Sequence, residues 1–563
     1  MTWGKRRAIV ICIVILFFVA LIWVASKPAH IASKSVLVLD VSGTIDEQRP
    51  ADIFSAFTGE STPVLHDYLD AIDAAYNDPH ITGIIVRVGP LSTGWGKLEE
   101  IRNHLVAFRR SGKPSICYLG YDGIGNPEYY VASACSQVWL LPTAPMGIHG
   151  MMAEALFMRG TLDKLKIVPQ FFHIAEYKTA TNMFTEKKFT PAHKDEVQTL
   201  LYGIYNQYLT DASQARGINR AKFESLVNQG PLSTDDALAG GLVDRKAYWD
   251  QVQSFFKLRD GGWHPILLNR YRAFLRPDGG DEIAIVHATG LIVSGESQNT
   301  AGGGFIMGGD SVAADIRRAR NNSDIKAIIL RIDSGGGSAV ASEVIRREVE
   351  LAKARKPVVV SMSDVAASGG YWIAMSANKI VADPNTITAS IGVLIGKFNI
   401  SGLYNLLGLS TDYVATSDNA TMFSGQLNFT PSQQAAIQKS LQETYANFTK
   451  GVAEGRHMTV EAVDKIGKGR VWTGAQAQEL GLVDELGGID TAVSVAKQLA
   501  NIPKNQSVHL LRFPVEKSFF QQLLERERDQ QIRQTQSLDD TLRQLAGVMD
   551  PIQARMPFEL HVK

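Results

Sequence analysis

The 563-residue sequence has few cysteines and no excess of charge of either sign. Its three cysteines, Cys12, Cys117 and Cys135, are too few and too badly spaced for a disulfide framework or a zinc site. The 57 basic and 57 acidic residues give a formal net charge of zero. Because nucleic-acid-binding proteins usually carry a concentrated basic excess, this composition predicts no nucleic-acid partner.

Long apolar runs are also scarce, and the exception lies near the N-terminus. Residues 8–25 are uncharged and apolar, and they follow Lys5, Arg6 and Arg7. These eighteen residues span about 27 Å as a helix, close to the thickness of a bilayer core. The basic residues predict a cytoplasmic N-terminus with the bulk of the chain outside. A cleaved signal peptide is the alternative, but the length of the run favours an uncleaved transmembrane anchor at residues 1–28.

The chain contains two copies of one sequence pattern. SVLVLDVSGTID from residue 35 parallels EIAIVHATGLIV from residue 282, and ITGIIVRVGPLSTGWGKLEEIR from residue 81 parallels IKAIILRIDSGGGSAVASEVIR from residue 325. Two further segments match in the same order, and the offset drifts only from 247 to 240 residues. This order indicates a tandem duplication, with a first repeat at residues 35–248 and a second at residues 282–500.

Each repeat alternates short, β-branched apolar runs with helical segments. This alternation predicts an α/β fold with mainly parallel sheets and crossover helices. Residues 249–281, rich in aromatic residues, Arg and Gly, are predicted to connect the repeats. Residues 501–563 form a polar tail, in which a helix from about residue 514 is equally consistent with solvent exposure and with binding a partner.

A glycine-rich turn follows one predicted strand of the second repeat. The strand is predicted to end at Ile332, and Gly335, Gly336 and Gly337 form the turn into a helix. Backbone N–H groups in such a loop make a small concavity that suits an anion. The sequence matches neither a phosphate-binding P-loop nor a dinucleotide fingerprint. A tight turn and an oxyanion hole for an attacked carbonyl both remain open.

A serine begins the next predicted helix of the second repeat. Ser368 precedes Gly369 and Gly370, and serine is a favoured helix cap at this position. The position also suits a nucleophile, because a sharp turn exposes the hydroxyl and the Gly369 N–H favours a developing anion. The two turns should face each other at the carboxyl ends of neighbouring strands, where open α/β sheets bind ligands. The first repeat has Asn126 in place of Ser368, which suggests that it lacks its own nucleophile.

The motifs DSGGGSAVASEVI, ASGGYW and TASIGV, in a duplicated chain with an N-terminal apolar run, resemble the long members of the serine–lysine signal peptide peptidase family. The resemblance covers the chain from Val36 to about Ala500, and the apolar run. It implies Clp-protease/crotonase-like domains, a serine–lysine dyad, a homotetramer and no metal or organic cofactor. It also implies a single-pass protein of the bacterial inner membrane whose periplasmic part cleaves signal peptides and other apolar polypeptide segments.

The resemblance also supplies a base for Ser368. In short members of the family, the lysine follows the serine within one repeat. Here the second repeat has no lysine in that region, whereas the first repeat has Lys178 in the family's Tyr-Lys-small-Ala context. Lys178 is therefore the implied base, in a dyad split across the two repeats. Burial would make this chemistry possible because it disfavours the charged form of the amine.

Further roles are implied by the same resemblance. Ser390 matches an accessory serine that orients the lysine amine, and the first repeat has Ile148 there. The implied oxyanion donors are the backbone N–H of Gly369 and that of Gly336 or Gly337. The family usually has a proline before these glycines, and its loss here leaves the choice between the last two open.

Two other functions fit parts of the sequence. One is a catalytically inactive scaffold on the same fold, and the other is a crotonase-type acyl-CoA enzyme that uses paired backbone donors. The N-terminal apolar run argues against the second, since acyl-CoA substrates are cytosolic. The retention of Lys178 and Ser368 in complementary repeats argues against the first. His173, five residues before Lys178, is a rival base that matches no family role.

Overall fold

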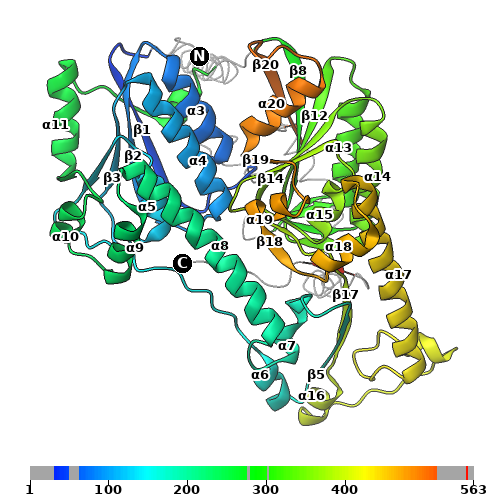
Figure 1. The fold of residues 1–563 in the computed structure, drawn as a ribbon. Helices are drawn as coiled ribbons and strands as arrows, with labels where there is room; N and C mark the ends of the chain where they lie inside the picture. The colour runs from blue at the N-terminus through cyan, green and yellow to red at the C-terminus, as the bar shows by residue number, and fades with distance from the viewer. Residues whose placement is uncertain (1–30, 50–61, 276–278, 301–303, 516–552, 556–563) are drawn as a thin grey trace, which may run out of the picture.

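Two α/β lobes lie side by side, and each is built from one sequence repeat (Figure 1). The computed structural model describes residues 31–49, 62–275, 279–300, 304–515 and 553–555. The predicted anchor and nearly all of the predicted tail helix lie outside the described residues. No described helix combines the length and the apolarity that a membrane crossing requires.

The first lobe contains a six-stranded sheet in the order β6-β4-β3-β2-β1-β7, with every neighbouring pair parallel. Its central strands are almost continuously buried, as expected for β-branched runs in a sheet with helices on both faces. The strands are β1 (Ser35–Gly43), β2 (Ile81–Leu91), β3 (Ser115–Leu119), β4 (Gln137–Leu140), β6 (Arg245–Lys246) and β7 (Pro265–Leu267).

Helices cover both faces of this sheet. One face packs against α11 through an apolar cluster that includes Val36, Ile85 and Phe256. The other face packs against a larger cluster that includes residues of the remaining helices (Figure 1). The helices are α3 (Leu65–Asn77), α4 (Trp95–Phe108), α5 (Asn126–Ala132), α8 (Pro191–Arg216), α9 (Arg220–Gln229), α10 (Thr234–Ala239), α11 (Trp249–Asp260) and α12 (Leu268–Arg272).

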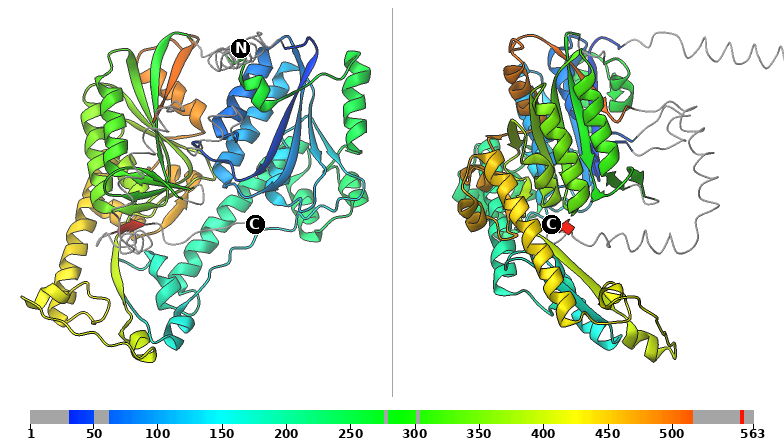
Figure 2. Two further views of the ribbon diagram at one scale, coloured as in Figure 1. Left: turned by 180° about the vertical axis from the view of Figure 1, so that it is seen from behind. Right: turned by 90° about the vertical axis from the view of Figure 1, so that its right-hand side faces the viewer.

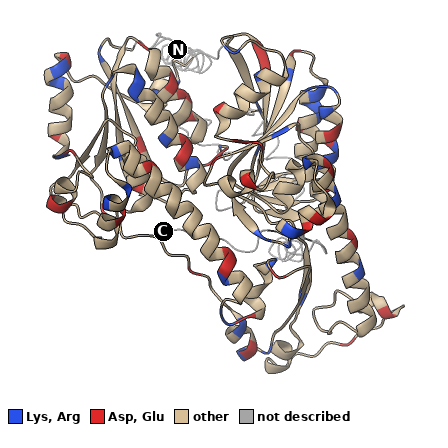
Figure 3. Cartoon of the chain, viewed as in Figure 1, with Lys and Arg blue, Asp and Glu red and all other residues tan. Residues whose placement is uncertain are grey.

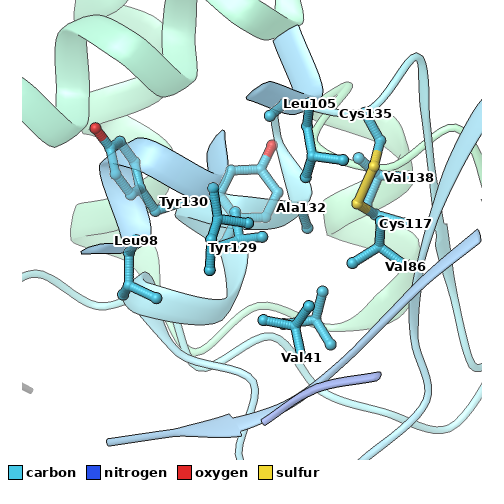
Figure 4. Close-up of a cluster of buried hydrophobic side chains, with 14 of the residues drawn as sticks. Val41, Val86, Leu98, Leu105, Cys117, Tyr129, Tyr130, Ala132, Cys135 and Val138 are labelled. Atoms are coloured by element: carbon cyan, nitrogen blue, oxygen red, sulfur yellow. A yellow bond between two sulfur atoms is a disulfide. The ribbon is translucent and has the colours of Figure 1, made fainter. Parts of the chain in front are cut away.

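A disulfide joins Cys117 and Cys135 within the larger of these clusters (Figure 4). Cys117 lies on β3, and Cys135 lies just before β4, which pairs with β3 in parallel. The spacing of the three cysteines did not predict this bond. It depends on the crossover through α5, which brings Cys135 to the start of β4, next to β3.

The second lobe repeats the strand order of the first, as β19-β15-β14-β12-β8-β20, and adds β16 and β18 beside β14. The predicted duplicated α/β fold with mainly parallel sheets is therefore confirmed. The strands are β8 (Asp281–Thr289), β12 (Ile325–Ser334), β14 (Val358–Ala367), β15 (Lys379–Ala382), β16 (Ile387–Ala389), β18 (Val471–Thr473), β19 (Glu485–Leu486) and β20 (Val508–Phe513). The helices are α13 (Gly309–Asn321), α14 (Ala339–Lys353), α15 (Gly369–Ala374), α17 (Pro431–Arg456), α18 (Val460–Ile466), α19 (Gly474–Glu479) and α20 (Ile489–Leu499).

Both sheets extend past the predicted ends of their repeats. β7 lies in the predicted connector, residues 249–281, and pairs with β1. β20 lies in the predicted tail, residues 501–563, and pairs with β8 in the same way. The connector and the first part of the tail therefore complete the two sheets at equivalent edges.

A third sheet joins the lobes, in the order β10-β11-β9-β13-β21-β17-β5. β5 belongs to the first repeat and pairs antiparallel with β17 of the second. β13 contains Gly336 and Gly337, which were predicted to lie in the turn into a helix, so part of this turn is a short strand directly before α14. The strands are β5 (Val168–His173), β9 (Leu291–Val293), β10 (Gln298–Asn299), β11 (Phe305–Gly308), β13 (Gly336–Ser338), β17 (Leu394–Asn399) and β21 (Gln553–Arg555).

The end of this sheet, with two long helices, forms an extension below both lobes (Figures 1 and 2). α8 and α17 are each 26 residues long, and each begins at a Thr-Pro pair whose threonine caps the helix. Three short helices lie at the tip: α6 (Arg159–Lys164), α7 (Asn182–Thr185) and α16 (Ser401–Leu406). The extension carries the segment after β5 toward the second lobe.

A buried charge cluster lies between the lobes. Arg331 on β12 donates to Glu47 of the first repeat at 2.7 Å, to Glu100 on α4, and to Ser361 on β14 at 2.8 Å. Burial raises the pKa of the Glu47 carboxyl, but the Arg331 guanidinium outweighs burial and holds that pKa below its usual range. Elsewhere, basic and acidic residues are interspersed over both lobes (Figure 3). The bonds of Arg331 to Glu47 and Glu100 therefore hold the sheet of the second lobe against the first lobe.

We expect Arg331→Met to lower the free energy of unfolding by about 3–5 kcal/mol, because it leaves two carboxyl groups buried without their cation. Urea titration followed by tryptophan fluorescence measures the change. Arg347→Met is the matched control, since the Arg347 side chain is 63% exposed and its pair with Glu350 is at the surface. That variant should change the stability by less than about 0.5 kcal/mol. Equal losses in the two variants would contradict the role of the cluster.

Candidate active site

Ser368 lies at the junction of β14 and α15. Its φ of 56° and ψ of −112° are rarely adopted by a residue with a side chain. The backbone is held there by the Ser368 N–H, which donates to Ala389 at 2.7 Å, and by its carbonyl, which accepts from Trp372 at 2.8 Å. As predicted, the serine directly precedes a helix, but its hydroxyl makes no capping hydrogen bond. The hydroxyl is therefore available for another partner.

That partner is Lys178 of the first repeat. Lys178 follows β5 and precedes the short 3-10 helix Thr179–Thr181, and the pairing of β5 with β17 brings this segment to the second lobe. Its Nζ lies 2.7 Å from Ser368 Oγ, 3.0 Å from Ser390 Oγ and 3.1 Å from the Ser390 carbonyl oxygen. The structure thus brings the three predicted side chains together within one chain, across 190 positions of sequence.

Burial dominates the chemistry of the lysine amine. Lys178 is 0% exposed, and this burial lowers the pKa of its amine well below the usual value, while the nearby Glu196 acts in the opposite direction. A lowered pKa favours the neutral amine, which has two N–H donors and one lone pair. The two donors match the hydroxyl and carbonyl oxygens of Ser390. The lone pair is then left to accept the Ser368 proton.

Ser390 is held so that its hydroxyl accepts from the lysine. It follows β16, with a φ of 52°. Its N–H donates to the Arg470 carbonyl at 2.8 Å, and its hydroxyl donates to the Gly469 carbonyl at 3.2 Å. Because the hydroxyl proton points to Gly469, an oxygen lone pair faces Lys178.

The glycine-rich segment lies beside the serine turn, as predicted from the order of the strands. β12 and β14 are neighbours, and a Cβ on Gly370 would lie 2.6 Å from the Ser334 carbonyl oxygen. The Gly336 N–H donates to Ser334 Oγ at 3.1 Å. Gly369 is the first residue of α15, so its N–H lies outside the intrahelical hydrogen bonds. Gly337 lies in β13, opposite Ala554 of β21.

The rival base is not at this site. His173 is exposed at the end of β5, and its Nδ1 lies 2.7 Å from the Ala175 carbonyl oxygen. It is Lys178, and not this imidazole, whose side chain reaches Ser368.

One group of described side chains has the spacing of metal ligands, and its members lie on α3, α4 and α20. His104 on α4 lies between Asp73 and Asp490, at 2.7 Å and 3.3 Å. Burial opposes protonation of the imidazole, but the two carboxylates raise the pKa of His104 to about 9. A protonated imidazole has no free lone pair for a metal. This trio therefore fits an ion-pair link that joins α4 to α3 and to α20.

The sequence patterns did not reveal one buried residue next to the lysine. Glu196 on α8 is 0% exposed, and the Thr179 hydroxyl donates to it at 3.1 Å. When the two repeats are aligned on the Thr-Pro pairs at the starts of α8 and α17, Glu196 matches Ala436. A glutamate present only in the repeat that carries the lysine could therefore have pointed to this residue.

Comparison with known proteins finds relatives that span most of the chain. The model of peptidase family S49 matches residues 107–260 and 350–503, one segment in each repeat. The chain is 35% identical to "Serine protease SPPA, chloroplastic" of Arabidopsis thaliana, over 85% of this chain and 71% of that protein. It is 34% identical to "Protease 4" of Salmonella typhi, over 84% and 79% of the two chains. It is 32% identical to "Protease 4" of Haemophilus influenzae, over 88% and 84%.

A solved structure also matches part of the chain. A mutant ClpP1 from Listeria monocytogenes covers 36% of this chain and 91% of its own, at 15% identity. The TM-score of 0.24 is too low to establish a shared fold.

We expect Gly469→Ala to displace Lys178 and slow acylation of Ser368 at least about tenfold, since small misplacements of reacting groups are costly. Gly469 has a φ of 82°, and a Cβ there would lie 2.5 Å from the Lys178 backbone nitrogen. Labelling of Ser368 by an activated ester, followed by mass spectrometry, measures the rate. Gly481→Ala is the control, because Gly481 has a similar φ of 77° but open space around it. Similar slowing in both variants would show that backbone strain, and not the clash, is responsible.

Proposed function

Because the chain belongs to peptidase family S49 and is a serine-type peptidase, we propose that it is a membrane-anchored endopeptidase whose dyad, Ser368 and Lys178, is split across the two repeats. The observation that carries the proposal is the 2.7 Å distance between Lys178 Nζ and Ser368 Oγ, two fully buried side chains. In water a lysine amine is almost entirely charged at neutral pH, and a charged amine accepts no proton. Burial removes that obstacle.

The reaction proceeds through an acyl-enzyme. The neutral Lys178 amine takes the Ser368 proton as Oγ attacks the peptide carbonyl carbon. The protonated amine then gives that proton to the leaving nitrogen, and the peptide bond breaks. A water molecule next loses a proton to Lys178 and attacks the ester, which releases the second product and returns the proton to Ser368. Ser390 keeps the amine aligned throughout, because its two oxygens accept the remaining N–H groups.

Backbone N–H groups stabilise the tetrahedral intermediate. The Gly369 N–H is adjacent to the nucleophile and is supported by the N-terminus of α15. The second donor comes from β13, where the Gly336 N–H is now held by Ser334 Oγ and Gly337 is next in sequence. Either N–H would take up the oxyanion by a small rotation of the glycine backbone.

The substrate binds as an extended strand. β21, from the chain's own C-terminal region, lies between β13 and β17 and pairs antiparallel with both. Such pairing uses backbone groups, so any extended polypeptide segment can form it. We therefore propose that cleaved signal peptides and other apolar segments, the substrates implied by the family resemblance, pair with the same two strands.

The location follows from the N-terminal sequence. Residues 8–25 are proposed to anchor the chain in the bacterial inner membrane, with the lobes on the periplasmic side. The family resemblance supports a homotetramer in this location. An anchored enzyme would meet signal peptides where they are released.

Ser368→Ala and Lys178→Ala should each reduce cleavage of an apolar peptide by at least about 10³-fold, since each removes one member of a dyad that acts as a unit. Chromatography of the products of a fluorescent peptide measures kcat and KM. Lys188→Ala is the matched control, because Lys188 is an exposed lysine of the same repeat, and it should retain full activity. Activity that survives in either dyad variant would refute the dyad, and an inactive wild type would favour the scaffold function.

The pH dependence of kcat/KM should report the lysine. Activity requires neutral Lys178, so it should be present at neutral pH and be lost as the pH falls through the lowered pKa of the amine. The midpoint of this acid limb should lie well below about 10.4, the pKa of free lysine. Initial rates at low substrate from pH 4 to pH 10 give the profile, and thermal unfolding at each pH identifies losses caused by denaturation. An acid limb centred near the free-lysine pKa would contradict the neutral amine.

A further inference from the structure

A carboxyl group lies directly behind the dyad, and the reaction described above does not use it. Glu196 lies on α8 and is 0% exposed. Both of its oxygens accept a hydrogen bond. Oε2 accepts from the Thr179 hydroxyl at 3.1 Å, and Oε1 accepts from the Val471 N–H at 2.8 Å.

These two hydrogen bonds join segments from different repeats. Thr179 is next in sequence to Lys178, in the first repeat. Val471 follows Gly469 and Arg470 of the second repeat, whose carbonyl oxygens accept from the hydroxyl and the N–H of Ser390. One carboxyl group therefore holds the segment that carries the base against the segment that orients the accessory serine.

The duplication provides an internal comparison for this link. With the repeats aligned on the starts of α8 and α17, the counterpart of Glu196 is Ala436. The matching of the LVD segments that end at residues 244 and 484 makes Pro231 the counterpart of Val471. Proline has no N–H, so the reverse link lacks both its acceptor and its donor. The link therefore exists only from Glu196 of the first repeat to Val471 of the second, the same pair of repeats that joins Lys178 to Ser368.

We propose that Glu196 is a positioning residue for the serine–lysine reaction, and that its carboxyl group holds Lys178 and Ser390 in register across the repeat interface. This inference rests on the proposed function and deepens it. Glu196 acts through Thr179 and Val471, and it touches neither the nucleophile nor the substrate.

The charge state of Glu196 supports this role. Burial raises the pKa of the Glu196 carboxyl to about 8, against the effects of its two hydrogen-bond donors and of the nearby Lys178 and Arg470. Arg470 is also paired with Asp195 at 2.8 Å. A carboxyl group with this pKa is mainly neutral at pH 7, and its Oε2 can still accept from the Thr179 hydroxyl. Neutrality matters because a carboxylate here would raise the pKa of Lys178 and favour the protonated amine, which is not a base.

The test compares Glu196→Gln with Glu196→Ala in the full-length chain. Glutamine can keep both contacts, with its carbonyl accepting from Val471 and its amide donating to Thr179. We expect Glu196→Gln to keep kcat for an apolar peptide within about threefold, and Glu196→Ala to lower kcat about 10- to 100-fold with little change in KM. The acid limb of kcat/KM should keep its midpoint in Glu196→Gln, because the carboxyl group of the wild type is already neutral at acidic pH. Gln198→Ala, an exposed position on the same helix, should match the wild type.

A second pair of variants guards against a folding defect. If thermal unfolding shows that Glu196→Ala is destabilised, Thr179→Val removes one hydrogen bond at nearly constant shape, and Thr179→Ser retains the hydroxyl. Lower kcat in the valine variant, with recovery in the serine variant, supports the inference. Wild-type kcat in Glu196→Ala, or wild-type kcat in Thr179→Val, overturns it.

A parallel measurement separates this inference from the proposed function. Active Lys178→Ala overturns the dyad and, with it, the role of Glu196. Inactive Lys178→Ala together with an unaltered kcat in Glu196→Ala overturns the positioning role alone. A Glu196→Gln variant as inactive as Glu196→Ala also overturns it, because the retained contacts would then be insufficient.

Discussion

A lysine amine becomes a base only when it is kept neutral, and water keeps it charged. The contact between Lys178 Nζ and Ser368 Oγ therefore depends on the burial of both side chains. Neither repeat encloses that site alone. The lysine comes from the loop after β5, the serine from the end of β14, and the close packing is completed by Gly469 and Gly392, where a Cβ would crowd the lysine. The interface between the repeats thus supplies the low-dielectric surroundings that the chemistry needs.

The duplicated sheets explain how the site came to be divided. The two lobes have the same strand order, so each places the same turns at the carboxyl edge of its sheet. Equivalent positions then carry different residues. The buried Arg331 binds Glu47 and Glu100 across the interface, whereas its counterpart Arg87 is half-buried and pairs with Asp40 within its own lobe. Because Arg331 pairs across the interface and Arg87 does not, the two lobes meet in one orientation, which brings Lys178 to Ser368.

The third sheet lies beside this site and has edges that pair with an extended strand. β5 and β17 unite the repeats beside the lysine, and β13 presents the glycine segment beside the serine. β21 shows that the space between β13 and β17 accepts an extended backbone with antiparallel pairing. The sheet that carries β5 beside Lys178 therefore also offers strand edges that pair with an extended backbone.

Local patterns in the sequence were sufficient for the main features of the fold, because these features depend on residues close together in the chain. Apolar runs alternating with helical segments predicted two parallel α/β units, and the Ser-Gly-Gly run placed Ser368 before a helix. Lys178 came from the resemblance to a known family, since no spacing in this chain would have selected it. Tertiary structure alone decided the rest, because contacts between distant residues depend on how the two lobes pack. The contact of Lys178 with Ser368, the burial that lowers the lysine pKa, and the link through Glu196 exist only once β5 lies beside β17. β7 and β20 look like a connector and a tail in the sequence, and they become strands because each sheet has a free edge that can take up their backbone hydrogen-bonding groups.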